Sequence, residues 1–289
     1  MLSWWYGLGQ WLALHLPLPV SYWIASRVAD LRYRLSSVDR RAMQGNLTVV
    51  LGSDSPAVSR ASRDVFRNFA KYLVDFFRFE TITPRFIAQR VTIVGRHHVD
   101  EALRQGRGAI LLSAHLGNYE LAAAVTARLG YPVQVVVLQH RDPRIDAFFT
   151  RQRRLAGVTS ISVGMALRQG FACLKRNQLL GILADRDFFN HGVRLPFLGR
   201  SMSIPRGPAL FSFRTGAPII PAFLVREPGD RFRFIFEQPI LPRGGVDETA
   251  EVDRLMRVSL AVLEQYIRRY PTQWYLFRDF EHPGPWVIW

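Results

Sequence analysis

Cysteine and lysine are scarce in this 289-residue chain. Cys173 is the only cysteine, which excludes an intramolecular disulfide and any cysteine-based metal cluster and fits a reducing compartment. It lies in a segment with a helical pattern, where we expect a small core side chain rather than a nucleophile. Among 38 basic residues only Lys71 and Lys175 are lysine, so arginine supplies nearly all of the positive charge.

Several catalytic motifs are also missing from the sequence. Without G-x-S-x-G, a serine esterase of the α/β-hydrolase type would lack its nucleophile elbow. Without a Walker A loop or G-x-G-x-x-G, nucleotide binding through those loops has no support. The zinc spacing H-E-x-x-H is absent, and the adjacent His97 and His98 would point in different directions in a helix or a strand. We therefore expect neither a metal ion nor a cofactor.

The excess of basic over acidic residues, 38 against 23, gives a formal charge of +15 and predicts anionic partners. These are an anionic membrane surface, a phosphorylated glycolipid or phospholipid acceptor, or an acidic carrier protein. Arginine suits phosphate because its planar guanidinium binds two oxygens at once. We expect no nucleic-acid partner, because the basic residues are dispersed and no nucleic-acid-binding motif is present.

From residue 91 onward, strand and helix patterns alternate, which predicts an α/β fold with a mostly parallel central sheet flanked by helices. Strands are expected at 91–94, 109–114, 133–138, 160–163, 179–184, 218–225 and 231–237. Helices are expected at 39–51, 57–79, 120–129, 143–155, 166–176, 205–214 and 248–269. The last two strands are joined by a short turn containing EPGD, so we expect an antiparallel hairpin at one edge of the sheet.

The first 35 residues differ from the rest, and we divide the chain into a membrane-associating segment, 1–35, and a main domain, 36–289. The segment holds four of the seven tryptophans, Trp4, Trp5, Trp11 and Trp23. Tryptophan favours the bilayer interface. Pro17 and Pro19 interrupt the apolar stretch before it reaches the roughly 20 residues that a spanning helix needs.

We therefore expect two amphipathic helices lying on the membrane, with Arg27, Arg32 and Arg34 at the level of the head groups. A secretory signal is not indicated, because the segment has no basic start and no clear cleavage site. The alternative is a helix pair buried against the main domain.

The strongest functional signal is AILLSAHLGNYELAAAVTARLG, residues 109–130. An apolar strand is followed by a turn at Gly117 and Asn118 and then by a helix, so His115 lies where a strand is followed by a helix. Such loops carry the chemistry of many α/β enzymes. Glu120, in the first helical turn, can approach the imidazole and fix its tautomer, and the positive helix end favours a neutral imidazole that acts as a base.

HLGNYE has the form H-x4-D/E and resembles the signature of the lysophospholipid acyltransferase superfamily, most closely that of bacterial late lipid A acyltransferases and phosphatidylinositol mannoside acyltransferases. Three further elements match approximately and in the expected order: RRAMQGNL at 40–47, a long second block at 179–223, and PTQW at 271–274. The resemblance implies an enzyme at the cytoplasmic face of the bacterial inner membrane. It would move a fatty acyl group from acyl-CoA or acyl carrier protein to a hydroxyl of a glycolipid or phospholipid.

The resemblance also implies roles for individual residues. His115 would be the general base, and Glu120 would orient it. An acid after the strand 179–184 would join them, and the residues leave open whether this is Asp185 or Asp187; the alternative is a turn in which Asp pairs with Arg186. The expected substrate-binding residues are Asn118, Arg186, Arg194 and Arg206, of which Arg206 begins a helix and suits a phosphate or carboxylate.

An acyl thioester is already activated, so the expected mechanism has no covalent intermediate. Backbone N–H groups near Gly117 or Arg206 would hold the oxyanion. The acyl chain would lie between the sheet and the aromatic helix 65–79. Two alternatives remain: a thioesterase or lipid hydrolase in which His115 activates water, and a non-catalytic lipid-binding protein of the same fold.

Overall fold

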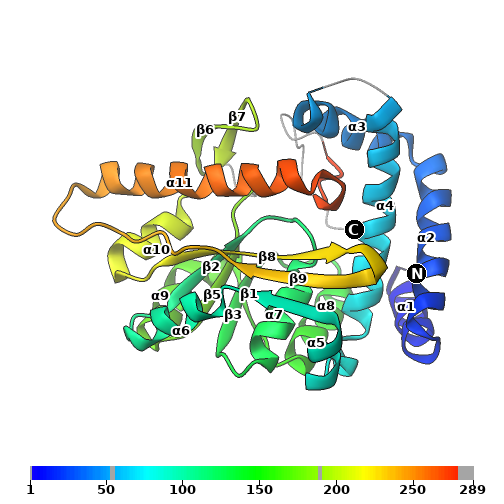
Figure 1. Ribbon diagram of the computed structural model, residues 1–289, viewed down its shortest axis with the longest axis horizontal. Helices are drawn as coiled ribbons and strands as arrows, with labels where there is room; N and C mark the ends of the chain where they lie inside the picture. The colour runs from blue at the N-terminus through cyan, green and yellow to red at the C-terminus, as the bar shows by residue number, and fades with distance from the viewer. Residues whose placement is uncertain (1, 53–55, 188–190, 279–289) are drawn as a thin grey trace.

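A computed structural model describes residues 2–52, 56–187 and 191–278 (Figure 1). The side chain of Trp4 and residues 188–190 of the second block lie outside the described part. The helices are α1 (Leu2–His15), α2 (Leu18–Leu35), α3 (Ser37–Leu51), α4 (Pro56–Phe77), α5 (Pro84–Arg90), α6 (Arg96–Arg104), α7 (Tyr119–Arg128), α8 (Pro143–Leu155), α9 (Ala166–Lys175), α10 (Gly207–Thr215) and α11 (Glu248–Arg269). The strands are β1 (Val91–Val94), β2 (Ala109–Ser113), β3 (Val133–Val137), β4 (Thr159–Ser162), β5 (Leu179–Leu183), β6 (Val193–Phe197), β7 (Arg200–Ile204), β8 (Ile219–Glu227) and β9 (Arg231–Phe236).

The central sheet has seven strands in the order β1-β9-β8-β2-β5-β3-β4. All neighbours are parallel except β8 and β9, so the expected fold class is confirmed. The hairpin is present, but its expected place at the edge is wrong. β1 pairs in parallel with β9 and forms the edge of the sheet in its place. β9 is covered on both faces, since Phe234 packs on one side and Ile235 on the other.

The apolar run of β2 follows from its central place in the sheet, where both faces are covered by helices. All five of its residues are buried. Ile110 and Leu112 pack with residues of α9, α10 and α11, whereas Ala109 and Leu111 pack on the other side with residues of α4, α7 and α8 (Figure 1). Cys173 is buried in the first of these cores, and burial raises the pKa of its thiol to about 11, which confirms a packing role.

The second sheet, the antiparallel pair β6 and β7, was not predicted from the sequence. The strands are joined at Leu198 and Gly199, both with positive φ (53° and 80°). Glycine is a usual residue in such a turn, but leucine is not, which is why the hairpin signal is missing. Glu264 of α11 accepts a hydrogen bond from the Leu198 N–H at 2.5 Å and fixes the turn.

The N-terminal helix α2 packs on α4 with one side and is exposed on the other. The inner side of α2 packs on α4, where Asp30 accepts hydrogen bonds from Arg63 at 2.8 Å and Arg67 at 2.7 Å. The outer side leaves Trp23 64% exposed and Leu31 56% exposed. In the described ranges, no helix has the length and apolar character of a membrane span. The segment is therefore part of the folded body and also presents an apolar face.

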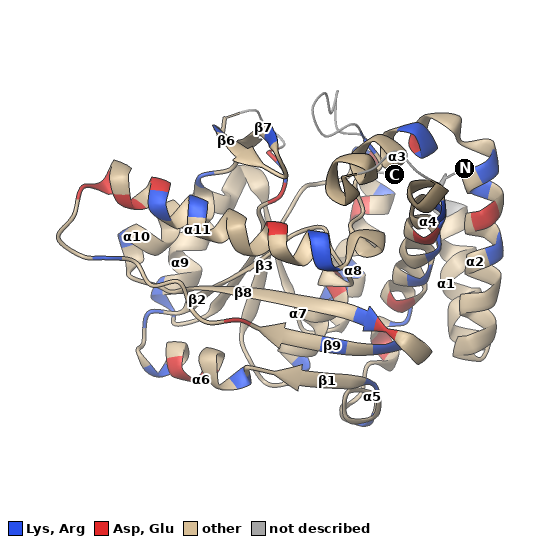
Figure 2. Ribbon diagram, turned by 45° about the horizontal axis from the view of Figure 1, so that its top comes forward, with Lys and Arg blue, Asp and Glu red and all other residues tan. Residues whose placement is uncertain are grey.

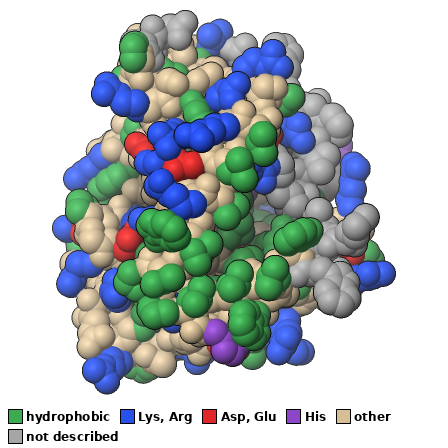
Figure 3. Space-filling view, turned by 90° about the vertical axis from the view of Figure 1, so that its right-hand side faces the viewer, with side chains coloured by type: hydrophobic (Ala, Val, Ile, Leu, Met, Phe, Trp, Pro, Cys, Tyr) green, Lys and Arg blue, Asp and Glu red, His purple; other side chains and the backbone are tan. Residues whose placement is uncertain are grey.

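Charged side chains are distributed over all layers of the molecule, with basic bands on α2, α3, α4 and α11 (Figure 2). Viewed from the side of α1 and α2, hydrophobic side chains gather in the lower half of the surface and arginines in the upper half (Figure 3). This face is thus both apolar and basic, the combination that suits an anionic lipid surface.

Candidate active site

His115 and Asp185 meet because their strands are neighbours in register. Ser113, the last residue of β2, pairs with Leu183, the last residue of β5. His115 and Asp185 each follow two positions later, at the carboxyl edge of the sheet. Oδ1 of Asp185 accepts hydrogen bonds from Nδ1 of His115 at 2.8 Å and from the His115 backbone N–H at 3.1 Å.

The second oxygen of Asp185 is held by the C-terminal segment. Trp274, the tryptophan of PTQW, donates its Nε1–H to Oδ2 at 3.0 Å. The backbone of the same segment holds the loop after β2: Gly117 N–H donates to the Gln273 carbonyl at 2.9 Å, and Tyr275 N–H donates to the His115 carbonyl at 2.8 Å. The P-x-x-W element therefore has a structural explanation that the sequence did not supply.

The environment of the pair favours an ionised Asp185 and a neutral His115. Burial and the nearby guanidinium of Arg186 lower the pKa of His115, and the charge of Asp185 only partly opposes them. Burial alone would raise the pKa of Asp185, but His115 and Arg186 outweigh it and hold that pKa well below its usual range. A carboxylate can only accept, so Nδ1 of His115 carries the proton and Nε2 is the basic nitrogen.

Asp187, the other acid that the sequence left open, has a different place. Its Oδ2 accepts hydrogen bonds from Gly192 N–H at 2.7 Å and Ser203 Oγ at 2.6 Å, at the open end of the β6–β7 hairpin. The chain leaves the strand conformation at Leu183, so the alternation expected for a continuing strand does not apply. The structure therefore places Asp185, not Asp187, against His115.

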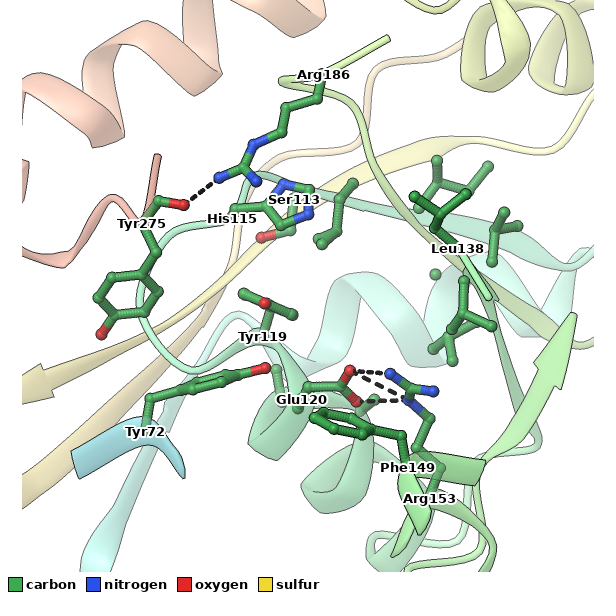
Figure 4. Close-up of a pocket in the computed structure, with 18 of the residues that line it drawn as sticks. Tyr72, Ser113, His115, Tyr119, Glu120, Leu138, Phe149, Arg153, Arg186 and Tyr275 are labelled. Carbon is green, nitrogen blue, oxygen red and sulfur yellow. Dashed lines mark hydrogen bonds and ion pairs between the residues drawn. The ribbon is translucent and has the colours of Figure 1, made fainter. Parts of the chain in front are cut away.

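Glu120 has a partner that the sequence did not predict. Its carboxylate faces Arg153 of α8, and the two side chains form a bidentate pair with distances of 2.9 Å and 2.5 Å (Figure 4). Both side chains are 9% exposed. Nδ1 of His115 thus donates to Asp185, and Glu120 belongs to a buried ion pair on the cavity wall.

The turn of the signature depends on Gly117 and Asn118. Gly117 has a positive φ of 65°, and a side chain there would collide with the Leu224 carbonyl oxygen. Asn118 caps α7, since its Oδ1 accepts from the Leu121 N–H at 3.0 Å. It is 2% exposed and buried in protein contacts.

The three arginines expected to bind substrate lie in different environments. Arg186 lines the cavity beside His115 and donates to the Tyr275 carbonyl (Figure 4). Arg206 is exposed at the start of α10. Arg194 is engaged on the β6–β7 hairpin, where it donates to the Ser201 carbonyl at 2.8 Å. Of these three, only Arg186 lies beside His115 and Asp185.

A cavity of about 700 Å³ extends from His115 between α4 and the sheet. Its walls are largely aliphatic and aromatic, drawn from α4, β3, β5 and α8, with Phe69, Leu73, Val135, Phe149 and Ile182 among them. Tyr119, Tyr72 and the Glu120–Arg153 pair add polar groups near His115 (Figure 4). Within the described residues, no cluster of three His, Cys, Asp or Glu side chains has the grouping that a metal ion needs.

Comparison with known proteins identifies the family of the chain. Residues 1–280 match the family model described as bacterial lipid A biosynthesis acyltransferase. The chain belongs to this family. A phosphatidylinositol mannoside acyltransferase of Mycolicibacterium smegmatis is 24% identical over 258 residues, which are 86% of this chain and 82% of that protein. A protein of the same name from Mycobacterium tuberculosis is 27% identical over 186 residues, 62% of this chain and 59% of that protein.

The protein is therefore an acyltransferase, and the resemblance of its sequence to lipid A and mannoside acyltransferases is confirmed. The structure adds residues that sequence reasoning missed, above all Arg153 and Trp274. Trp274 belongs to the PTQW element at 271–274, but the sequence indicated no role for its side chain. Arg153 lies on α8 in no recognisable pattern, and only the fold brings it to Glu120.

The buried Glu120–Arg153 pair makes a prediction about stability. Arg153→Leu should lower the free energy of unfolding by about 3–5 kcal/mol, because it leaves the Glu120 carboxylate buried without a partner. The double variant Arg153→Leu/Glu120→Leu should recover much of that loss, since it removes both charges. Urea unfolding of the three proteins measures both values. Equal destabilisation in the single and double variants would contradict the pairing.

Proposed function

We propose that this acyltransferase moves a fatty acyl group from a thioester to a hydroxyl of a membrane lipid, with His115 as the general base and Asp185 as its orienting acid. The observation that carries the proposal is the 2.8 Å hydrogen bond between Nδ1 of His115 and Asp185, beside an apolar cavity of about 700 Å³. A volume of that size lies within the range of about 300–1,000 Å³ typical of small-molecule sites. We assign the acyl chain to it.

In the proposed reaction, Nε2 of His115 takes the proton from the acceptor hydroxyl while that oxygen attacks the thioester carbonyl carbon. The carbon–sulfur bond then breaks, and the leaving thiolate takes the proton from the imidazolium. Asp185 keeps the Nδ1–H tautomer and stabilises the transient positive charge, as the third member of a nucleophile–base–acid arrangement does in other acyl transfers. Both protein groups return to their starting state.

We assign the stabilisation of the oxyanion to Arg186. The Gly117 N–H, an expected donor, is already bonded to the Gln273 carbonyl, and Arg206 is exposed at the start of α10. The side chain of Arg186 is 11% exposed and lines the cavity beside His115. A fixed positive charge in a site of low polarity acts strongly on a developing oxyanion.

The acceptor and the donor follow from chemistry and from the relatives. Two relatives are phosphatidylinositol mannoside acyltransferases by name, and we propose a phosphorylated glycolipid or phospholipid as acceptor here. An acyl-CoA or an acyl carrier protein thioester would serve as donor. No cofactor enters the proposed reaction, since a thioester needs no further activation.

We propose that α1 and α2 bind the membrane from the cytoplasmic side without crossing it. Trp5, Trp11 and Trp23 are 70%, 56% and 64% exposed on these helices. The cavity reaches the same face, since Trp5 and Arg32 are among its lining residues (Figure 3). A lipid on that surface would thus lie at the entrance to the site.

The catalytic proposal is tested by single-turnover transfer from palmitoyl-CoA to phosphatidylinositol mannoside in vesicles, with palmitoyl acyl carrier protein as a second donor. His115→Ala should abolish transfer, and Asp185→Asn should lower the rate by about two to four orders of magnitude, the scale of general-base assistance. Asp187→Asn is the matched control and should retain most of the rate. Near-normal transfer by His115→Ala, or acyl release by the native protein at the same rate without a lipid alcohol, would contradict the proposal.

The membrane proposal is tested with one substitution at two sites of similar exposure. Leu31 on α2 is 56% exposed and Leu167 on α9 is 59% exposed. Leu31→Ser should weaken binding to phosphatidylglycerol vesicles about tenfold, because an apolar side chain is lost from the interface. Leu167→Ser should leave binding unchanged. Equal effects in co-sedimentation would show that α2 does not touch the lipid.

A further inference from the structure

Asp75 is a buried carboxylate that the proposed reaction does not use. It lies near the end of α4, is 6% exposed, and accepts hydrogen bonds from three different elements. The donors are the Tyr22 hydroxyl of α2, Nδ2 of Asn118 at 2.7 Å, and the guanidinium of Arg226 on β8. A buried charge is costly unless it is paired and hydrogen-bonded, so these contacts fix the three elements relative to one another.

The contact with Asn118 reaches the catalytic turn directly. Oδ1 of Asn118 caps α7, and the backbone N–H of Asn118 donates to the Leu224 carbonyl at 2.8 Å. The amide group is planar, so Asp75 holds Nδ2 and thereby sets the direction of Oδ1. The position of residues 115–118 between β2 and α7 therefore depends on Asp75.

The contact with Arg226 reaches the same turn by a second route. The backbone N–H of Arg226 donates to Oε1 of Gln273, and Nε2 of Gln273 donates to the Arg226 carbonyl, both at 2.8 Å. The Gln273 carbonyl in turn accepts from Gly117 at 2.9 Å. Trp274, the partner of Asp185, is the next residue. Both sides of the catalytic pair are thus connected to Asp75.

Tyr22 connects this network to α2. Burial and the charge of Asp75 raise the pKa of its phenol, so the hydroxyl stays protonated and donates. Tyr22 is buried on the inner side of α2, whereas the next residue, Trp23, belongs to the exposed apolar face. One helix therefore carries both the proposed lipid contact and a hydrogen bond to the network behind the catalytic turn.

We infer that Asp75 is a positioning residue for acyl transfer: it holds the turn 115–118 through Asn118 and couples the position of that turn to α2 through Tyr22. The inference rests on the proposed role of His115 as the base. A base displaced by a fraction of an ångström still allows substrate to bind but transfers the proton poorly. Loss of the Tyr22 hydroxyl should therefore lower kcat and leave KM unchanged.

The test compares Tyr22→Phe with Tyr33→Phe in the full chain. Tyr33 is a matched control, since it also lies on α2 and its hydroxyl also binds α4, at the Ser59 carbonyl, 3.2 Å away. For palmitoyl-CoA and phosphatidylinositol mannoside vesicles, Tyr22→Phe should lower kcat about five- to tenfold at constant KM, the effect of a small misplacement of the base. Tyr33→Phe should keep the native kcat. Thermal unfolding of both proteins reports any general loss of stability.

Amide hydrogen exchange provides a readout that does not require activity. Tyr22→Phe should speed exchange of the amides of residues 117–121 several-fold, whereas Tyr33→Phe should leave them as in the native protein. Native exchange in this segment together with native kcat in Tyr22→Phe would overturn the inference. If the native protein transfers no acyl group, the proposed function fails, and faster exchange in Tyr22→Phe alone would still establish the coupling of the turn to α2.

Discussion

The site depends on a hydrogen bond between two residues that are 70 positions apart, Nδ1 of His115 and Oδ1 of Asp185. It forms because β2 and β5 are adjacent, parallel and in register, so that residues two positions beyond each strand end meet. Burial keeps the imidazole neutral and leaves the carboxylate with no water to compete for its oxygens. The sheet therefore brings the proposed base and its proposed orienting acid together.

The remaining structure keeps this pair in place. The C-terminal segment supplies Trp274 to Asp185 and backbone contacts to the loop, while Asn46 of α3 donates to the Leu276 carbonyl at 2.7 Å and holds that segment. Asp75 holds the loop from the other side. Each element that resembled a family motif thus supplies a residue to this set of contacts: Asn46, His115, Asp185 and Trp274. Their common function is to position His115 at the wall of an apolar cavity.

The sequence predicted the parallel sheet, the main helices and the place of His115 between a strand and a helix, because hydrophobic periodicity and turn residues are local signals. It did not decide between Asp185 and Asp187, since that choice depends on where the chain leaves the strand. It assigned Glu120 to His115, although α8 brings Arg153 to Glu120 from 33 residues away. The β6–β7 hairpin was missed because leucine occupies a position of positive φ. The first two points concern contacts made by tertiary structure, which a local pattern does not encode.

The central claim is that His115 is a neutral base whose Nδ1–H is bonded to Asp185. The direct measurement is a pH titration of the His115 ring by nitrogen-15 NMR in the full chain, with Asp185→Asn for comparison. We expect a protonated Nδ1 and a bare Nε2 at neutral pH, a pKa below the ordinary histidine value, and a still lower pKa in Asp185→Asn because a negative charge is removed. An imidazolium at neutral pH, or a proton on Nε2 in the native protein, would contradict the account.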